Sequence, residues 1–458
     1  MSAILISGGV IVNEGRQFLG YLVVRDGVIA EVGEGSFEGS FRGERIDARG
    51  KIVMPGVVDV HVHFREPGLT TKGDMVSESR AAVAGGITTV FEMPNTQPAT
   101  TSLDALERKF DLAAERMHTN YSFYLGATND NLAEIRCLNP REVCGVKLFM
   151  GSSTGNMLVD SNYALSALFA ESPVIISAHC EDEAIIRANA EQFRLSNPRG
   201  PASIHPLVRT AEACYRSSAA AVELADRYSA RLHVAHLTTA RELALFDTKP
   251  YRDKRITAEA CVPHLWFSET DYPRLANRIK CNPAIKTATD RAALREALST
   301  GRLDAVATDH APHLRNEKRR TYWHAPSGIP MVQHSLVAMM QLVSEGVLSI
   351  ETLVERMCHA PATIFNIEGR GFLRPGYKAD ITIIDPAFAD PESGETGWVV
   401  SPANILSKCG WSPLEGVTLG SRVAYTIING HVIYNSAVLE TPDGLSPETF
   451  GERLTFAR

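Results

Sequence analysis

Two histidines one residue apart are the side chains of this chain best suited to bind a metal. His61 and His63 lie in the segment DVHVHFREPG, at the end of an apolar run. In a β-strand, residues i and i+2 point to the same side, so this spacing brings two imidazoles to one point in space. Imidazole pairs of this kind hold many first-row metals. Taken alone, the pair is equally compatible with two hydrogen-bonded histidines of a half-buried strand.

Three further side chains of metal-binding type close short apolar runs later in the chain. His179 ends PVIISAHC, His236 lies near the end of RLHVAHL, and Asp309 lies in DAVATDHAP. Short branched apolar runs that alternate with helical stretches are typical of buried parallel strands.

Eight such runs occur, and helical patterns such as 73–85 and 208–228 separate them. This alternation predicts an α/β fold with a (β/α)8 TIM barrel. The ligand-type residues fall at the carboxyl ends of the first, fifth, sixth and eighth strands, which is the face where such barrels carry their active sites. A metal site is therefore favoured over scattered core histidines. The eight predicted strands are 57–64, 86–93, 120–127, 145–151, 173–180, 231–237, 256–262 and 304–312.

A lysine, Lys147, lies inside the fourth predicted strand, in the segment VKLFM. Lysines are rarely buried without a partner, and in isolation a salt-bridged or snorkelling lysine is the simpler interpretation. The four histidines and one aspartate, however, supply five ligands for a two-metal site that lacks an anionic bridge. Carbon dioxide bound to the neutral amine of Lys147 as a carbamate would supply that bridge, and burial near cations favours the neutral amine.

The order of these residues resembles the amidohydrolase superfamily, whose binuclear members share this ligand set. Within it, five segments resemble the dihydroorotase family of cyclic amidohydrolases: FREPG (64–68), AAVAGGITTVFEMPNTQP (81–98), SAHCED (177–182), KCNPAIK (280–286) and DHAPH (309–313). The resemblance covers nearly the whole chain. It implies a barrel enzyme that reversibly hydrolyses L-dihydroorotate to N-carbamoyl-L-aspartate in de novo pyrimidine (UMP) biosynthesis, with a hydroxide bridging its two metals.

The resemblance also implies a role for each matching residue. Two divalent metal ions, with zinc the first expectation, are held by His61, His63, Lys147, His179, His236 and Asp309, and Asp309 also acts as the general base. One branch of the family bridges its metals with an aspartate after the fourth strand; here the segment SSTGNMLVD has no acid before Asp160, which favours carbamylated Lys147. Substrate binding is assigned to Arg65, Asn95, Asn282 and His313.

Arg65 has a chemical argument of its own, because the planar donors of a guanidinium match a carboxylate in a bidentate manner. The competing interpretation is a surface salt bridge to Glu66 or another acid. A hydantoinase, dihydropyrimidinase or allantoinase would share the metal ligands, but the neutral ring of its substrate offers no carboxylate to Arg65.

A non-catalytic scaffold with this barrel would be expected to lack some of the metal ligands, whereas all six are present here. The segment GSSTG (151–155) could be a mobile lid or an ordinary connection.

Length and composition set the remaining expectations. The 458 residues exceed a barrel of roughly 250 residues, so a small β-sandwich domain is expected from both termini, 1–54 and 371–458, around a barrel at 55–370. Asp26-Gly27 and Asn429-Gly430 are predicted hairpin turns in this β domain.

The net charge of −7 argues against nucleic-acid binding. The absence of an 18-residue apolar run predicts no membrane segment, and a cytoplasmic enzyme is expected. The eight cysteines, without CxxC spacing, are expected to be reduced, and a homo-oligomer is left open.

Overall fold

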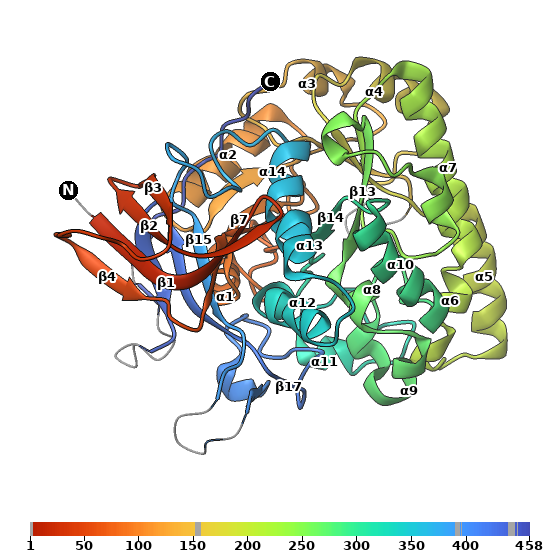
Figure 1. Cartoon of the computed structure of the whole chain (residues 1–458). Coiled ribbons are helices and arrows are strands. Elements are labelled where there is room, and N and C mark those ends of the chain that lie inside the picture. The colour runs from red at the N-terminus through yellow and green to blue at the C-terminus, as the bar shows by residue number, and fades with distance from the viewer. Residues whose placement is uncertain (1–2, 152–156, 390–393, 395, 438–444, 447) are drawn as a thin grey trace.

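The computed structural model describes the chain except residues 1–2, 152–156, 390–393, 395, 438–444 and 447, and it contains a barrel of parallel strands (Figure 1). Two hydrogen-bonded groups, β6-β7-β8 and β9 to β14, make up the barrel wall. The ring closes where His63 N donates to His310 O at 2.7 Å. The strands are β6 (Val57–Val62), β7 (Ile87–Glu92), β8 (Asn120–Phe123) continued by β9 (Leu125–Gly126), β10 (Val146–Phe149), β11 (Ile176–His179), β12 (Leu232–Val234), β13 (Ile256–Cys261) and β14 (Ala305–Ala307).

Helices cover the outside of this ring, and their starting points are marked in the sequence (Figure 1). The side chains of Asp74, Ser102, Ser161 and Thr210 each accept a hydrogen bond from the backbone N–H three residues later, which satisfies an otherwise free donor of the first turn. The longer helices are α1 (Met75–Ala84), α2 (Leu103–Ala114), α4 (Asn162–Glu171), α5 (Glu183–Ser196), α7 (Ala211–Tyr228), α10 (Ala288–Thr300) and α12 (Ser335–Ser344). The shorter ones include α3 (Leu132–Arg136), α6 (His205–Val208), α8 (Val262–Trp266), α9 (Tyr272–Leu275), α11 (Arg315–Lys318), α13 (Ile350–Val354) and α14 (Ala360–Ile364).

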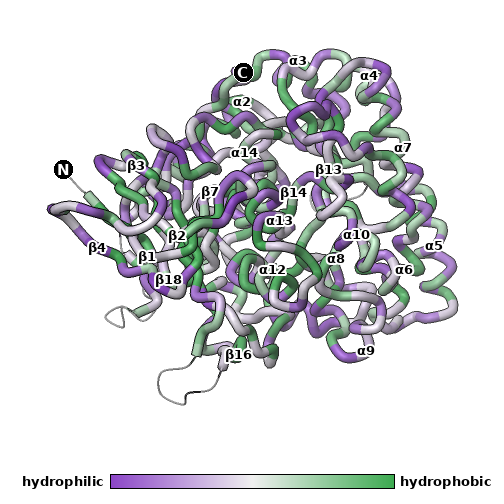
Figure 2. The backbone as a smooth tube through the Cα atoms, in the orientation of Figure 1, coloured by the Kyte–Doolittle hydropathy of each residue, from purple (hydrophilic) through white to green (hydrophobic). Residues whose placement is uncertain are grey.

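Burial explains why the barrel strands contain continuous apolar runs. Every residue of β6, β7, β8 and β10 is buried, because helices cover one side of the wall and the barrel interior fills the other. The outer helices are amphipathic instead, and Figure 2 shows hydrophilic and hydrophobic positions alternating along α5 and α7. A polar or charged side chain inside a barrel strand is therefore an exception that requires a partner.

Segments from both ends of the chain form a second layer of structure beside the barrel (Figure 1). Their mixed sheet has the order β19-β18-β15-β5-β1-β2-β3, and β4 pairs with β1. Both predicted hairpin turns are present, with positive φ at Asp26 and Gly27 and at Asn429 and Gly430, as type I′ turns require. The strands are β1 (Ala3–Asn13), β2 (Arg16–Arg25), β3 (Val28–Glu34), β4 (Glu44–Asp47), β5 (Ile52–Pro55), β15 (Ile381–Asp385), β18 (Arg422–Ile428) and β19 (His431–Asn435).

The predicted architecture, a TIM barrel with a small β domain from both termini, is confirmed. The division at residues 54 and 370 stays a proposal. Strand β5 belongs to the terminal sheet and leads directly into β6, so the site-bearing strand starts from a fixed anchor. The segment 151–155, for which the sequence left a lid or an ordinary connection open, lies outside the described residues except for Gly151. All eight cysteines are free thiols, and no helix in the described ranges is long and apolar enough to cross a membrane.

Candidate active site

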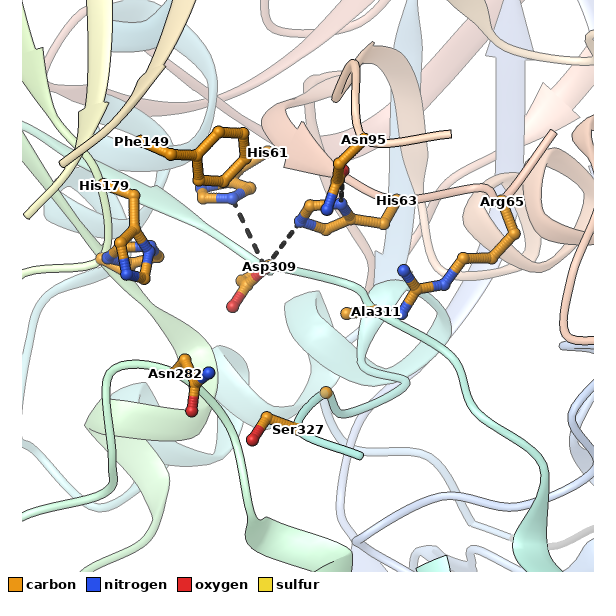
Figure 3. Close-up of a pocket in the computed structure, with 12 residues that line it drawn as sticks. His61, His63, Arg65, Asn95, Phe149, His179, Asn282, Asp309, Ala311 and Ser327 are labelled. Atoms are coloured by element: carbon orange, nitrogen blue, oxygen red, sulfur yellow. Dashed lines mark hydrogen bonds and ion pairs between the residues drawn. The ribbon is translucent and has the colours of Figure 1, made fainter. Parts of the chain in front are cut away.

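A pocket at the carboxyl ends of the barrel strands brings together most of the predicted site residues (Figure 3). Because the strands run parallel, their carboxyl ends meet at one end of the barrel. His61 lies in β6, His179 ends β11, and Asp309 follows β14 by two residues. Lys147 lies in β10, two residues before the lining residue Phe149. The pocket is lined by His61, His63, Arg65, Asn95, Phe149, His179, His236, Asn282, Asp309, Ala311, Ser327 and Gly328.

The first two histidines converge on the aspartate. His61 Nε2 and His63 Nε2 lie 3.4 and 3.1 Å from Asp309 Oδ1, and these ligand-type atoms all lie within 4.8 Å of one another. The opposite ring nitrogens are occupied: His61 Nδ1 lies 2.7 Å from Glu259 Oε1, and His63 Nδ1 lies 2.7 Å from Asn95 Oδ1. These contacts orient both rings so that their Nε2 atoms face Asp309. Metal-binding histidines are commonly oriented in this way.

The rings of the second pair of histidines face each other. His179 Nδ1 lies 2.9 Å from His236 Nε2, while His179 Nε2 contacts Glu181 Oε2 at 3.0 Å. His236 Nδ1 is buried without a hydrogen-bond partner in the described part of the chain. Either tautomer of His236 therefore leaves one buried ring nitrogen unsatisfied, which is costly. His179 Nδ1 and His236 Nε2 face each other, so a cation between them could bind a lone pair of each ring, and the residues fit a metal.

Lys147 is fully buried, and its Nζ has no hydrogen-bond partner among the described residues. Burial lowers the pKa of its ammonium group to about 8, despite the nearby carboxylates of Glu259 and Asp309. A buried amine without an acceptor is a costly arrangement for an unmodified lysine. A carbamate at this position, whose nitrogen is uncharged and whose carboxylate could bind a cation, therefore suits the geometry.

Backbone strain and charge both single out the loop residues of the site. His236, Asp309 and Arg65 have φ values of 39°, 46° and 72°. Such left-handed conformations cost non-glycine residues of order 1–3 kcal/mol each and persist where the surrounding fold enforces them. Burial raises the pKa of Asp309, but His61, His63 and Lys147 outweigh this effect and lower it to about 2. Asp309 is therefore held ionised at neutral pH.

The guanidinium of Arg65 is buried at the other end of the pocket without an acidic partner. Its Nε donates to Pro312 O at 3.0 Å, and no carboxylate lies within 4 Å of it in the described ranges. The alternative salt bridge to Glu66 is not formed, because Glu66 pairs with Arg116 at 3.2 Å. His313 lies beside the guanidinium, with its Nε2 3.1 Å from Arg65 Nη2.

The two predicted substrate-binding amides lie on opposite sides of the pocket. Asn95 faces His63, and Asn282 lies across the pocket near Ser327 (Figure 3). Asn282 Oδ1 is buried and has no hydrogen-bond partner in the described part of the chain. The ten predicted site residues are thus gathered around one pocket, whereas their individual roles stay predictions.

Sequence reasoning missed several residues that complete the site. Glu259 binds His61 and also His233, at 3.1 Å from His233 Nε2, and Glu181 binds His179. The available signal for Glu259 was a lone acid inside the apolar strand ITAEACV. Glu181 follows His179 by two residues. Phe149, which also lines the pocket, carried no such signal.

Comparison with known proteins agrees with this geometry. Residues 52–433 match the model of the Amidohydrolase family, so this chain belongs to the amidohydrolase family. It is 34% identical over 444 residues to a dihydroorotase of Geobacter metallireducens, covering 94% of this chain and 99% of that protein. A dihydroorotase of Halobacterium salinarum is 32% identical over 445 residues, covering 92% of this chain and 98% of the relative.

Solved structures that resemble the chain include hydantoinases. An L-hydantoinase (dihydropyrimidinase) from Arthrobacter aurescens superimposes with a TM-score of 0.91 at 27% identity, covering 99% of this chain and 100% of that chain. A dihydropyrimidinase from Brevibacillus agri has a TM-score of 0.87 at 20% identity, with full coverage of both chains, which supports the fold alone. Together with the family, these relatives define the chain as a cyclic amide hydrolase and confirm the predicted resemblance.

Proposed function

We propose that this enzyme is a dihydroorotase, which reversibly hydrolyses L-dihydroorotate to N-carbamoyl-L-aspartate in pyrimidine biosynthesis. The observation that carries the proposal is Arg65, a guanidinium that is 3% exposed, lines the pocket and lacks a carboxylate partner in the described ranges. Isolated buried charges are expensive, so this group is built to receive an anion. The carboxylate of dihydroorotate supplies that anion, with Asn95 and His313 beside it.

In the metal-binding part of the proposal, His61, His63 and Asp309 would hold one ion and His179 and His236 a second, and carbamylated Lys147 would supply a further carboxylate ligand. Imidazole and carboxylate ligands suit zinc, which we propose as the metal. When bound, the metals lower the pKa of a water molecule and polarise the amide carbonyl. The chain's own contribution is to orient the ligands, through Glu259, Asn95 and Glu181.

Asp309 performs the proton transfers in this mechanism. In the hydrolytic direction, water adds across the ring amide, so its hydroxyl joins the carbonyl carbon and its proton passes through Asp309 to the departing ring nitrogen. In the cyclising direction, the nitrogen returns its proton and water leaves. Arg65 and Asn282 hold the ring in place while this happens. We further propose that the enzyme works in the cytoplasm on this small molecule and that any oligomer it forms is a homo-oligomer.

A hydantoinase is the second candidate, because the Arthrobacter L-hydantoinase is similar over nearly the whole chain. The metal ligands would be shared between the two activities. A neutral hydantoin ring, however, would leave the charge of Arg65 buried and unpaired. The decisive experiment is therefore a direct comparison of the purified protein's initial rates on L-dihydroorotate, hydantoin and dihydrouracil, and a preference for the neutral rings would refute the dihydroorotase proposal.

Replacing Arg65 by Met should depress the use of dihydroorotate far more than that of a neutral ring. A charge-assisted hydrogen bond contributes roughly 1.5–3 kcal/mol, so kcat/KM for dihydroorotate should fall about tenfold to several hundredfold. Metal content should be unchanged. An Arg227→Met variant, at an exposed position, is the matched control. Equal losses on charged and neutral rings would show that Arg65 supports the architecture of the site instead.

The two directions of the reaction should have opposite pH dependences. N-carbamoyl-L-aspartate carries one more carboxylate than dihydroorotate, so hydrolysis releases a proton and cyclisation consumes one. Above the pKa of that carboxyl group, the ratio of hydrolytic to cyclising kcat/KM should rise about tenfold per pH unit. Asp309, whose pKa is lowered to about 2 in the protein alone, is ionised as hydrolysis requires. Initial rates in both directions from about pH 5 to 9 test this, and parallel profiles would contradict it.

A further inference from the structure

Two lysines are buried behind the pocket wall that carries Asn282, Ser327 and Gly328. Lys318 and Lys280 are only 4% and 8% exposed. Within the described residues, neither ammonium group has a carboxylate within 4 Å. Lysine is almost never buried to this extent without an acidic partner. The pair therefore requires an explanation.

Backbone carbonyls occupy every hydrogen-bonding position of Lys318. Its Nζ donates to Lys280 O at 3.0 Å and to Pro326 O and Gly328 O at 2.9 Å each. Lys280 Nζ likewise donates to two carbonyl oxygens of segment 322–325, at 2.7 and 2.6 Å. These bonds occupy the three donors of Lys318 and two of Lys280, and they connect the loops that carry Asn282 and Ser327. Burial lowers the pKa of Lys318 well below its ordinary range and that of Lys280 to about 8. Three carbonyl acceptors around Lys318 Nζ nevertheless match the three N–H donors that only its ammonium form has, so the geometry selects the charged form, and neither charge has a carboxylate partner.

The wall that these lysines hold is in close contact with the anion-binding end of the pocket. A Cβ atom at Gly328 would lie 2.5 Å from Ala311 O and 2.8 Å from the ring of His313, so only glycine allows this approach. His313 in turn contacts Arg65. Burial lowers the pKa of His313 well below its ordinary range, and the positive charges of Arg65 and Lys318 lower it further. The field of Lys318 thus extends to the residues proposed to bind the substrate carboxylate.

Several cationic side chains that lack a carboxylate within 4 Å in the described part of the chain gather near this end of the pocket. Glu317 contacts His313 at this end of the pocket, and it pairs with Lys72 at 3.1 Å. Arg65, Lys280 and Lys318 are left without an acidic partner in the described part of the chain. An anionic ligand would be stabilised by all three charges, because electrostatic interactions are strong where water is excluded.

We propose that Lys318 and Lys280 select substrates by charge without touching them. Their ammonium groups favour a ligand with two carboxylates over a ligand with one carboxylate, and a ligand with one carboxylate over a neutral ligand. They are positioning residues that also fix the Asn282 and Ser327 loops. The inference rests on the proposed function and deepens it, since N-carbamoyl-L-aspartate carries two carboxylates and dihydroorotate one. The uncompensated charges therefore hold the open form of the substrate more tightly than the ring.

Three unreactive ligands of similar size but different charge test this proposal. Succinamide carries no negative charge, succinamate carries one and succinate carries two. Each is tested as a competitive inhibitor of the parent enzyme's hydrolysis of the cyclic amide that it prefers. For Lys318→Met, the inhibition constant of succinamide should stay within about twofold of the parent's, while those of succinamate and succinate should rise about tenfold and about a hundredfold. Similar losses for all three ligands would show that Lys318 only clamps the loops and would overturn the proposal.

Two further variants keep the test decisive. Lys280→Met removes the second charge and should give the same graded pattern, even if Lys318→Met fails to fold. Glu317→Gln removes the acid instead, so succinate should bind more tightly than to the parent. Lys249→Met, at an exposed lysine paired with Asp247, is the control that should change nothing. Unchanged succinate binding in Lys280→Met and Glu317→Gln would refute the proposal, whereas failure of the dihydroorotase assignment would appear in the parent's substrate preference alone.

Discussion

Replacement of Asp309 by Asn should reduce hydrolysis of dihydroorotate by at least about 10² to 10⁴, the range typical of a general acid–base group. The amide is nearly isosteric with the carboxylate but cannot accept and return the proton. Loss of its negative charge also weakens the site around His61 and His63, whose Nε2 atoms lie 3.4 and 3.1 Å from Asp309 Oδ1. The measurement is kcat in both directions together with the metal content of the purified variant.

Folding must be shown to be intact for this result to be interpreted. Circular dichroism and the melting temperature of Asp309→Asn should be compared with those of Asp247→Asn, which changes an exposed aspartate in the same way. If Asp309→Asn kept its metals and turned over at a near-normal rate, the proton acceptor would have to be another residue.

Replacement of Lys147 by Ala should remove metal ions and, with them, nearly all activity. Several kcal/mol of stabilisation at the reacting carbonyl would be lost, which corresponds to a decrease of about a hundredfold or more. The reason is structural: the amine of Lys147 is fully buried, has no acceptor in the described part of the chain, and has a pKa lowered to about 8 by burial. Metal analysis and hydrolysis rates on the same sample test this expectation.

Chemical rescue separates the carbamate from a purely structural lysine. A small carboxylic acid such as acetate can enter the space left in Lys147→Ala and replace the missing carboxylate, so both metal content and activity should partly return. Lys249→Ala, at an exposed position, should show neither the loss nor the rescue. Metal content and activity close to the parent's in Lys147→Ala would refute the carbamate.

The fold and the position of the site could be predicted because both follow from local patterns. Each barrel strand is a short run that is buried on both faces, so it appears as an uninterrupted apolar segment, and each predicted strand overlaps an observed one. The hairpin turns at Asp26-Gly27 and Asn429-Gly430 were equally local, since type I′ turns require residues that tolerate positive φ. Parallel strands place their carboxyl ends on one face, and this brought His61, His179 and Asp309 together in the prediction.

Tertiary structure alone determined which groups support these residues. Glu259 meets His61 across 198 positions of sequence, and Arg65 lies beside Pro312 and His313 only because the barrel closes between β6 and β14. The pairing of Lys318 with carbonyls rather than carboxylates likewise had no sequence signal, because a lysine in RNEKRR is typical of an exposed helix. The local sequence determines whether a segment forms a helix, a strand or a turn, through its propensity and its pattern of burial. The partner of a buried charge depends instead on barrel closure and strand register, which are properties of the whole chain.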